Sequence, residues 1–400
     1  MATRDLPADS RSDRQGAGLA VRRLTLTDFR CYKHQRLEVD ARPVVLTGPN
    51  GAGKTNLLEG LSFLVPGRGL RRAKLADVIR RNPETDDAPR PSLRPWGVAA
   101  TVMTPQGDVD IGTGFQAGPP GGRDKRIVRI DGEEAKTQAV LAEHVSAQWL
   151  TPLMDRLFLE GAGSRRRFLD RLVFDSDPAH LGRIKAYEHA MRERTRLLSG
   201  SKPDGDWLAA LEDTMAARGV AVAAARLDLV RRLGVPLAEH ADAFPRAAVE
   251  VSGDVEGWLA EGPALAAEDR FRDALKRGRG RDAKDGRTAL GPHRSDLQVQ
   301  HLENGRPAAI CSTGEQKALL VALVLGTARM RAYEQGTAPL LLLDEVAAHL
   351  DDIRRDALYD EISALGSQVW LTGTDAGLFG PLAGRAQFFN VADGTVTPQK

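Results

Sequence analysis

The sequence predicts an α/β fold in which a mixed sheet with an antiparallel part is split by a mostly helical insertion. First, a short apolar strand, a glycine-rich loop and an apolar helical segment follow one another over residues 44–64. Second, strands and helices alternate over residues 297–371 in the β-α-β-α-β order of a parallel sheet covered by helices. Third, two long helical stretches, 177–198 and 206–237, are joined at 200–205 and predict an antiparallel arm.

These observations also suggest where the chain divides. We expect an extension at residues 1–20 without stable structure, because its residues are polar and of mixed charge. The two halves of the sheet-containing domain are expected at 21–170 and 286–400. The helical insertion and a linker are expected between them, at 171–285. A chain of 400 residues is long enough for two structural units or one large domain with an insertion.

Composition limits the possible classes of protein. Hydrophobic residues make up 42% of the chain, which is enough for a core, and the net charge is only +2. Any surface that binds nucleic acid must therefore be local. Two cysteines far apart, Cys31 and Cys311, favour a reducing cytoplasm over a disulfide framework. No apolar run approaches the roughly 20 residues that span a bilayer, and residues 1–18 lack the apolar stretch of a secretory signal.

The first part of the chain is expected to be rich in strands. Residues 21–28 alternate apolar and polar side chains, as in a half-buried strand, and 36–39 is the expected hairpin partner. A loop at 90–95 and a proline- and glycine-rich turn at 119–122 separate further segments of strand length. These segments predict antiparallel strands at 98–102, 109–115 and 126–130.

The remaining elements follow the arm. Neither long helical stretch keeps a heptad pattern for long enough to form a long coiled coil. Residues 263–277 predict another helix, and the charged, glycine-rich residues 278–287 are expected to be a linker. The C-terminal elements are expected to be strands at 297–299 and 308–310, a helix at 314–333, a strand at 339–343, a helix at 353–365 and a strand at 369–371.

The glycine-rich loop carries the strongest chemical signal. Residues 48–55 match the pattern G-x-x-x-x-G-K-[ST], and they lie between a strand and a helix, the context that this motif requires. Glycines allow backbone N–H groups to surround phosphate oxygens at a helix N-terminus. Lys54 would reach the β- and γ-phosphates of ATP, and Thr55 would bind Mg²⁺. The two flanks disfavour a chance glycine-rich turn. We assign phosphate binding to Gly48, Pro49, Asn50, Gly51, Ala52, Gly53, Lys54 and Thr55.

A pair of acids follows the apolar strand 339–343. An aspartate at the carboxyl end of a buried strand can hold Mg²⁺, and we assign this role to Asp344. The next residue, Glu345, can polarise the water that attacks the γ-phosphate. The alternative is a buried strand that merely ends in two surface acids. The phosphate loop in the same chain favours the functional interpretation.

A second loop with the features of a phosphate-reading site lies between these two motifs. It comprises Ser312, Gly314, Glu315 and Gln316 at the start of a predicted helix. ABC-type ATPases use such a signature loop to read the γ-phosphate held by an opposite subunit, so the loop predicts a homodimer that encloses ATP. The alternative is a simple helix cap, with Ser312 and Glu315 as a capping box. The order of the three motifs favours the signature, and 347–351 then falls where that class has its D-loop.

From about residue 21 to the end, the chain resembles the RecF family of DNA recombination and repair proteins, which are related to the SMC ATPases. The most specific stretches are Phe29-Arg30, Arg165 to Asp170, and Gly291 to Leu297. Gln148 lies where the family's Q-loop glutamine falls, and the resemblance implies contact with Mg²⁺ or the attacking water. A strand-end polar residue is the alternative. With Lys54 and Glu345, Gln148 completes the predicted catalytic set.

Two positions depart from the expected patterns. Ser295 stands where the family usually has a second acid or another residue before the aspartate, which leaves that motif imperfect. Residues 372–375 contain no histidine, although ABC transporter domains place a γ-phosphate-sensing histidine in this region. This absence disfavours a transporter and leaves the switch residue unassigned.

The resemblance implies weak, DNA-stimulated ATP hydrolysis coupled to dimerisation on DNA. It also implies binding at gaps or single-strand/double-strand junctions, and cooperation with RecR and RecO in loading RecA. The chain's aromatic content of 5% disfavours base stacking and favours contacts with the duplex backbone. The candidate DNA contacts belong to the basic runs that include Arg71, Arg72, Arg165, Arg166 and Arg167. Alternatively, Arg165 to Arg167 face the protein's own acids or the nucleotide, and His293 and Arg294 are assigned to the subunit interior or the dimer seam.

Three other functions remain open. A tether of the SMC or cohesin type needs helical arms far longer than 177–237. A transporter ATPase subunit would need a membrane partner and would show no dependence on DNA. A regulatory module with vestigial hydrolysis is mildly disfavoured because both Asp344 and Glu345 are present.

Overall fold

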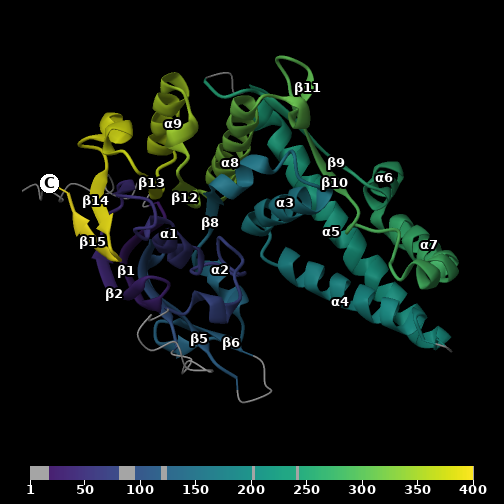
Figure 1. The fold of residues 1–400 in the computed structure, drawn as a ribbon. Helices are drawn as coiled ribbons and strands as arrows, with labels where there is room; N and C mark the ends of the chain where they lie inside the picture. Colours follow the sequence, from purple (N-terminus) through teal and green to yellow (C-terminus); the bar gives the residue numbers. More distant parts are fainter. Residues whose placement is uncertain (1–17, 81–94, 119–123, 201–202, 240–242, 400) are drawn as a thin grey trace, which may run out of the picture. The chain divides into compact units, whose positions relative to one another are not determined.

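The computed structural model describes residues 18–80, 95–118, 124–200, 203–239 and 243–399 (Figure 1). Most of the predicted N-terminal extension lies outside these residues, as do Arg81, residues 90–94 and the turn at 119–122. The chain forms two compact units. The first unit comprises residues 1–149, 331–348 and 358–400, and the second comprises 150–330 and 349–357.

The first unit is built around a six-stranded sheet of order β15-β14-β3-β13-β12-β8. β3 pairs in parallel with β13 and β14, and β13 pairs in parallel with β12. β15 closes one edge and is antiparallel to β14. The strands are β3 (Val44–Thr47), β8 (Ala147–Leu150), β12 (Leu340–Asp344), β13 (Val369–Gly373), β14 (Gln387–Ala392) and β15 (Thr395–Pro398). The parallel sheet predicted from the C-terminal alternation is thus confirmed.

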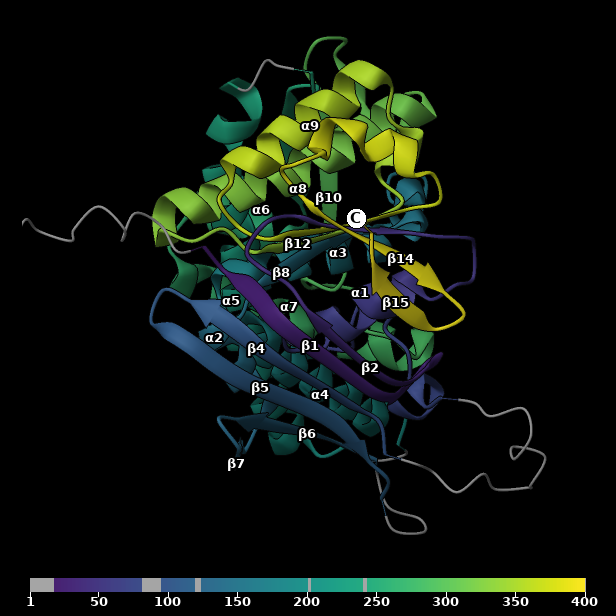
Figure 2. The ribbon, with the colours of Figure 1, turned by 90° about the vertical axis from the view of Figure 1, so that its left-hand side faces the viewer.

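A second sheet of the first unit is antiparallel throughout, with the order β2-β1-β4-β5-β6-β7. Figure 2 shows β1, β4 and β5 side by side. The strands are β1 (Ala20–Phe29), β2 (Tyr32–Glu38), β4 (Gly97–Thr104), β5 (Gly107–Gln116), β6 (Lys125–Ile130) and β7 (Glu133–Glu134). They confirm the predicted strands at 21–28, 36–39, 98–102, 109–115 and 126–130.

Helix α1 (Lys54–Ser62) follows β3 directly and buries its apolar face, which includes Leu57, Leu58 and Leu61. A Cβ atom at Gly60 would lie 2.7 Å from Leu26 Cδ2, so glycine allows close contact between α1 and β1. The other short helices of this unit are α2 (Leu141–His144) and the 3-10 segments Leu75–Val78, Gln138–Val140 and Ala376–Leu382. A further 3-10 segment, Ala347–His349, follows β12.

The second unit is mostly helical, as the sequence predicts. The long helices α4 (His180–Leu198) and α5 (Gly205–Glu239) correspond to the two predicted halves of the arm. The unit also contains α3 (Ala162–Ser176), α6 (Asp254–Glu261), α7 (Ala264–Asp285) and the first part of α8 (Thr313–Gln335). A small antiparallel sheet has the order β11-β10-β9, with β9 (Ala247–Ser252), β10 (Asp296–His301) and β11 (Arg306–Pro307). A 3-10 turn spans Pro152–Arg156, and α9 (Asp352–Ala364) is shared between the units.

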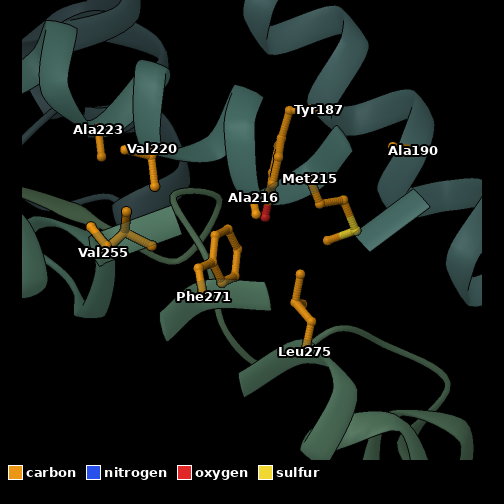
Figure 3. Close-up of a cluster of buried hydrophobic side chains, with 10 residues drawn as sticks. Tyr187, Ala190, Met215, Ala216, Val220, Ala223, Val255, Phe271 and Leu275 are labelled. Carbon is orange, nitrogen blue, oxygen red and sulfur yellow. The ribbon is translucent and has the colours of Figure 1, made fainter. Parts of the chain in front are cut away.

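The core of the second unit joins three of these helices. Tyr187 of α4, Met215 and Val220 of α5, and Phe271 and Leu275 of α7 are buried together (Figure 3). Each apolar side chain removed from water stabilises the fold by about 1.5–3 kcal/mol. The arm is therefore one packed body with α7. The second unit also includes residues 150–170, 286–330 and 349–357, which lie outside the predicted insertion of 171–285.

The predicted linker at 278–287 is wrong, because α7 continues through it to Asp285. The reason is a buried charge on α4. The guanidinium of Arg194 donates to Glu212 Oε1 at 2.9 Å and to Asp282 Oδ2 at 2.8 Å, and all three residues are buried. Arg279 donates to Glu212 Oε2 as well. A buried ion pair must keep its partners, so this network fixes 279–282 as helix despite the glycines at 278 and 280.

The predicted strand at 308–310 is also wrong. Ala308–Ile310 forms a 3-10 turn that leads into α8, and pairing with β10 is limited to Arg306 and Pro307. The side chain of Ile310 is 68% exposed, so this segment has no second buried side chain to hold it against the sheet.

Candidate nucleotide-binding site

The loop between β3 and α1 has the backbone of a phosphate-binding loop. Gly48, Gly51 and Gly53 have φ angles of +142°, +81° and +119°, a region that side chains disfavour. Space also requires glycine at two of them. A Cβ at Gly48 would lie 2.1 Å from the carbonyl oxygen of Val391, and one at Gly53 would lie 2.8 Å from both Cys31 Sγ and Tyr32 Oη. The three glycines are therefore needed for this loop geometry.

Lys54 lies across this loop. Its Nζ donates to the carbonyl oxygens of Gly48 at 2.7 Å and Pro49 at 2.9 Å. Burial lowers the pKa of Lys54, and the nearby charges of Glu345 and Asp344 oppose that change. Both hydrogen-bond partners are neutral carbonyls, so the ammonium charge is suited to an anionic ligand.

Asp344, the last residue of β12, meets the phosphate loop. Its Oδ1 accepts hydrogen bonds from Thr55 Oγ1 at 2.9 Å and from Thr372 Oγ1 at 2.8 Å. Burial raises the pKa of Asp344, although these two hydrogen bonds oppose the rise. The Thr55 hydroxyl and the Asp344 carboxylate are the oxygen ligands that Mg²⁺ prefers, and they are adjacent, so they fit this cation. No cluster of three or more His, Cys, Asp or Glu side chains suited to a metal occurs among the described residues, so further ligands would come from phosphates and water.

Glu345 follows Asp344 at an unusual backbone angle. Its φ is +54°, and its N–H donates to Thr372 Oγ1 at 3.0 Å. Residues other than glycine rarely adopt positive φ, and such residues concentrate at functional sites. The structure thus brings together the predicted residues Lys54, Thr55, Asp344 and Glu345, with Thr372 as a fifth member that the sequence analysis did not assign.

Gln148 lies in β8, which is the neighbour of β12 at the edge of the sheet. It is fully buried, and the other residues of this short strand are also buried. Its predicted contact with Mg²⁺ or the attacking water remains a prediction.

The predicted signature loop lies in the second unit and forms a capping box at the start of α8. The N–H of Ser312 donates to Glu315 Oε2 at 2.7 Å, and the N–H of Glu315 donates to Ser312 Oγ at 3.3 Å. Ser312 and Gly314 are exposed, and the Gly314 backbone has open space beside it. Gln316 is buried and donates from Nε2 to the carbonyl of Cys311 at 2.9 Å. The loop therefore presents Ser312 and Gly314 to solvent, while the side chain of Gln316 supports it from within.

Two side chains outside the motifs hold the phosphate-loop helix. Tyr32 Oη donates to the carbonyl oxygen of Gly53 at 3.0 Å. Arg126 of β6 donates to the carbonyls of Phe63, Val65 and Gly67, just after α1, and burial lowers its pKa to about 10. Cations stabilise the carbonyl end of a helix. Sequence reasoning did not identify either role, because these bonds join segments that are distant in the chain.

The arginines that were predicted to contact DNA differ in their hydrogen-bond partners and in their exposure. Arg165 forms a bidentate pair with Asp296, and Arg166 donates to the carbonyl of Ser295. Arg71 donates to Asn56 Oδ1 and to the buried Glu59, which also binds Arg30. Arg71, Arg72 and Arg167 are exposed, and Arg167 donates to Ser164 Oγ at 2.7 Å. The protein's own acceptors thus bind Arg71, Arg165, Arg166 and Arg167, and the partner of Arg165 is an acid, as the alternative interpretation stated.

The two mid-chain family stretches, 165–170 and 291–297, contact one another in the second unit. Besides the bonds of Arg165 and Arg166, Arg226 of α5 donates to both carboxylate oxygens of Asp170 and to the carbonyl of Pro292. The unusual Ser295 is fully buried and donates to Glu256 Oε1 at 2.6 Å. Ser295 thus has a buried carboxylate, that of Glu256, beside it.

His293, which the sequence analysis assigned to the subunit interior or the dimer seam, faces the interior of the second unit. Its Nδ1 lies 2.7 Å from Tyr187 Oη, and its Nε2 lies 3.0 Å from the carbonyl oxygen of Thr288. Burial lowers the pKa of His293.

Among the helices of the described ranges, none is both long and apolar enough to cross a membrane.

A phosphate loop and an acid pair at the carboxyl ends of two parallel strands that flank β13, together with an antiparallel sheet, define an ABC-type ATPase head. Residues 20–381 match the model of the RecF/RecN/SMC N-terminal domain. The chain belongs to the RecF family within that group.

Relatives and solved structures agree with this assignment. The chain is 49% identical over 380 residues to the DNA replication and repair protein RecF of Mesorhizobium japonicum, covering 94% of this chain and 97% of the relative. It is 47% identical over 395 residues to RecF of Brucella abortus, covering 98% and 100%. The solved structure of the recombination mediator protein RecF-ATPrS in the RecFOR pathway superposes with a TM-score of 0.82 at 22% identity, covering 97% of this chain and 100% of that chain. Because the sequence identity is only 22%, this similarity shows that the two chains share a fold.

Proposed function

We propose that this chain is an ATP-dependent DNA-binding protein of recombination and repair. It binds ATP and Mg²⁺ in the first unit, dimerises on DNA and helps to load a recombinase at gaps and stalled forks. Its ATP hydrolysis is slow and is stimulated by DNA. RecR is the proposed direct partner, with RecO and RecA acting in the same process. The two cysteines are both free, which agrees with a cytoplasmic location.

One contact carries this proposal. Thr55 and Asp344 are 289 positions apart, and their side chains are hydrogen-bonded in a chain that is about half identical to RecF proteins over almost its full length. The bond joins the phosphate loop to the acid strand, which is the arrangement that a nucleotide-hydrolysing site needs. An arm of this size also argues against a long tether, because α5 has 35 residues and spans about 50 Å at 1.5 Å per residue.

In this proposal, each residue of the site has a separate role in ATP hydrolysis. The backbone N–H groups of 48–55 surround the phosphates, and Lys54 compensates the charge of the β- and γ-phosphates. Thr55 and Asp344 hold Mg²⁺, which neutralises phosphate charge when it is bound. Glu345 accepts a proton from the attacking water as a general base, and Gln148 orients that water or contacts the cation.

The homodimer supplies the remaining contacts. In this proposal, Ser312 and Gly314 of the opposite subunit bind the γ-phosphate, so that ATP is enclosed only in the dimer. Glu315 holds the loop in shape through its bond to the Ser312 N–H. Among the predicted DNA contacts, Arg71, Arg72 and Arg167 are favoured because all three are exposed.

The experiment that tests this function measures ATP hydrolysis with and without gapped duplex DNA, together with molar mass by light scattering. The wild type is expected to hydrolyse ATP faster with DNA and to dimerise with ATP. Glu345→Gln is expected to keep the nucleotide and to accumulate as a dimer, because the base is lost and the binding groups remain. Lys54→Ala is expected to lose nucleotide binding.

The results of this experiment test the role in DNA repair and the role of Glu345 separately. If DNA changes neither the rate nor the mass, the role in repair is contradicted while the ATP site stands. If Glu345→Gln hydrolyses ATP at the normal rate, Glu345 is not the base.

A further inference from the structure

Thr372 lies in β13, where its hydroxyl group reaches both predicted acid residues. β13 runs between the strand of the phosphate loop, β3, and the strand of the acid pair, β12. In the register of the sheet, Thr372 pairs with Asp344 of β12 on one side and with Leu46 of β3 on the other. It is 1% exposed, so solvent does not compete for its hydroxyl group.

The hydroxyl of Thr372 makes a separate bond to each acid residue. Oγ1 donates to Asp344 Oδ1 at 2.8 Å, and it accepts the N–H of Glu345 at 3.0 Å. A threonine hydroxyl has one hydrogen to donate, and Asp344 Oδ1 also accepts from Thr55 at 2.9 Å. The two hydroxyls therefore hold one carboxylate oxygen of Asp344 from the phosphate-loop side and from the β13 side.

The second bond acts on a strained residue. Glu345 has a φ of +54°, an angle that a glutamate rarely adopts. Such a conformation persists only where its surroundings enforce it. The bond from the Glu345 N–H to Thr372 fixes the peptide between the two acids, and this peptide sets the direction in which the Glu345 side chain leaves the chain.

We propose that Thr372 is a positioning residue for ATP hydrolysis, which orients the cation-binding carboxylate of Asp344 and the general base Glu345 together. This inference rests on the proposed function and deepens it. Residues 372–375 lack the histidine that transporter ABC domains have in this region. A valine has nearly the same shape as threonine but makes neither bond, and serine makes both.

The test compares Thr372→Val with Thr372→Ser. Ser367→Ala is the matched control, because Ser367 is also buried and donates to the carbonyl of Pro339 at 2.9 Å, at the opposite end of the same two strands. Three quantities are measured for each protein: kcat for ATP, the Kd of a fluorescent ATP analogue, and the melting temperature. A fourth, the Mn²⁺ affinity in the presence of a non-hydrolysable ATP analogue, does not depend on hydrolysis.

For Thr372→Val, kcat is expected to fall about tenfold or more, and the Mn²⁺ affinity to fall about fivefold, while the nucleotide Kd changes less than about threefold. Thr372→Ser is expected to restore kcat and Mn²⁺ affinity to within about threefold of the wild type. Ser367→Ala is expected to lower only the melting temperature. A catalytic loss of equal size in Ser367→Ala would make Thr372 a merely structural residue.

The inference is overturned if Thr372→Val keeps the wild-type kcat and Mn²⁺ affinity. If the wild type itself hydrolyses no ATP, the hydrolytic role proposed for Thr372 fails together with the proposed ATPase activity. In that case the Mn²⁺ affinities still decide whether Thr372 orients Asp344. Unchanged kcat with weakened Mn²⁺ binding would contradict the part of the proposal that concerns Glu345.

Discussion

Arg165 and Asp296, which are 131 positions apart, are joined by two parallel hydrogen bonds, from Nε to Oδ1 at 2.7 Å and from Nη2 to Oδ2 at 2.8 Å. This bidentate geometry is among the strongest that a charged pair can adopt. It connects α3 to β10 within the second unit, and the hydrogen bond with Asp296 raises the pKa of Arg165. An arginine of a basic run is thus bound by an acid of its own unit.

The adjacent arginines of this run should therefore respond differently to replacement. Arg165→Ala is expected to lower the free energy of unfolding by about 2–3 kcal/mol, because Asp296 loses its partner. Arg167→Ala is expected to leave stability unchanged, within about 0.5 kcal/mol, and to weaken DNA binding. Denaturant unfolding and DNA titrations at several salt concentrations distinguish the two. If the salt dependence of binding is the same for Arg167→Ala as for the wild type, Arg167 makes no phosphate contact.

Restoring an acid at Ser295 should destabilise this protein. Ser295→Asp would place a second carboxylate beside the buried Glu256, whose Oε1 now accepts the serine hydroxyl. A loss of about 2–4 kcal/mol in the free energy of unfolding is expected, and Glu256→Gln should recover most of it in the double variant. Denaturant unfolding of the two single variants and the double variant gives the coupling energy. Additive losses would mean that the two side chains do not interact.

Replacement of Asp170 should change stability in a pH-dependent way. Burial alone would raise the pKa of this carboxyl, but bonds from His180 and Arg226 outweigh burial, and the pKa is lowered. The contribution of Asp170 to stability is therefore complete above its unfolded pKa of about 3.9 and is lost as the pH falls through the folded value. Asp170→Asn is expected to cost about 1–3 kcal/mol at pH 7, and the difference from the wild type should shrink below about pH 4. Unfolding curves between pH 3 and pH 8 test this, and a difference that stays constant would exclude the charge as its cause.

Removal of one hydroxyl outside the phosphate loop should weaken nucleotide binding. Tyr32→Phe deletes the bond to the carbonyl of Gly53, and a buried hydrogen bond is worth about 1 kcal/mol. The ATP affinity is expected to fall about fivefold, because the loop must then be ordered by the nucleotide itself. Tyr333→Phe is a suitable control, since Tyr333 is 93% exposed. Equal affinities for the two variants would show that Tyr32 does not organise the loop.

Local sequence patterns were sufficient to predict the central residues of the nucleotide-binding site. The loop 48–55 and the acids Asp344 and Glu345 were predicted because each follows an apolar strand and carries a fixed spacing of residue types. The sheet topology then brings them together, because parallel strands end at the same edge. Most strands and helices were predicted for the same reason, from apolar periodicity.

Three of the features that the sequence analysis missed share one physical origin, which is contact between distant segments. The residues 278–285 are helical because a buried arginine on α4 binds Asp282, and nothing in the local sequence indicates that partner. Thr372 is an ordinary strand residue until β12 lies beside it. Arg126 belongs by its sequence to a plain antiparallel strand, yet it caps the carbonyl end of α1.

The bond between Thr55 and Asp344 has a consequence for synthesis of the protein. The ribosome makes the chain from its N-terminus, at about 5–20 residues per second. The phosphate loop therefore emerges many seconds before the acid strand, which is 289 positions later. A nascent or prematurely terminated chain that ends before Asp344 carries the loop without its acids. Under the proposed mechanism such a product lacks both the cation ligand and the general base, so ATP hydrolysis is expected only after residues 344 and 345 have been made.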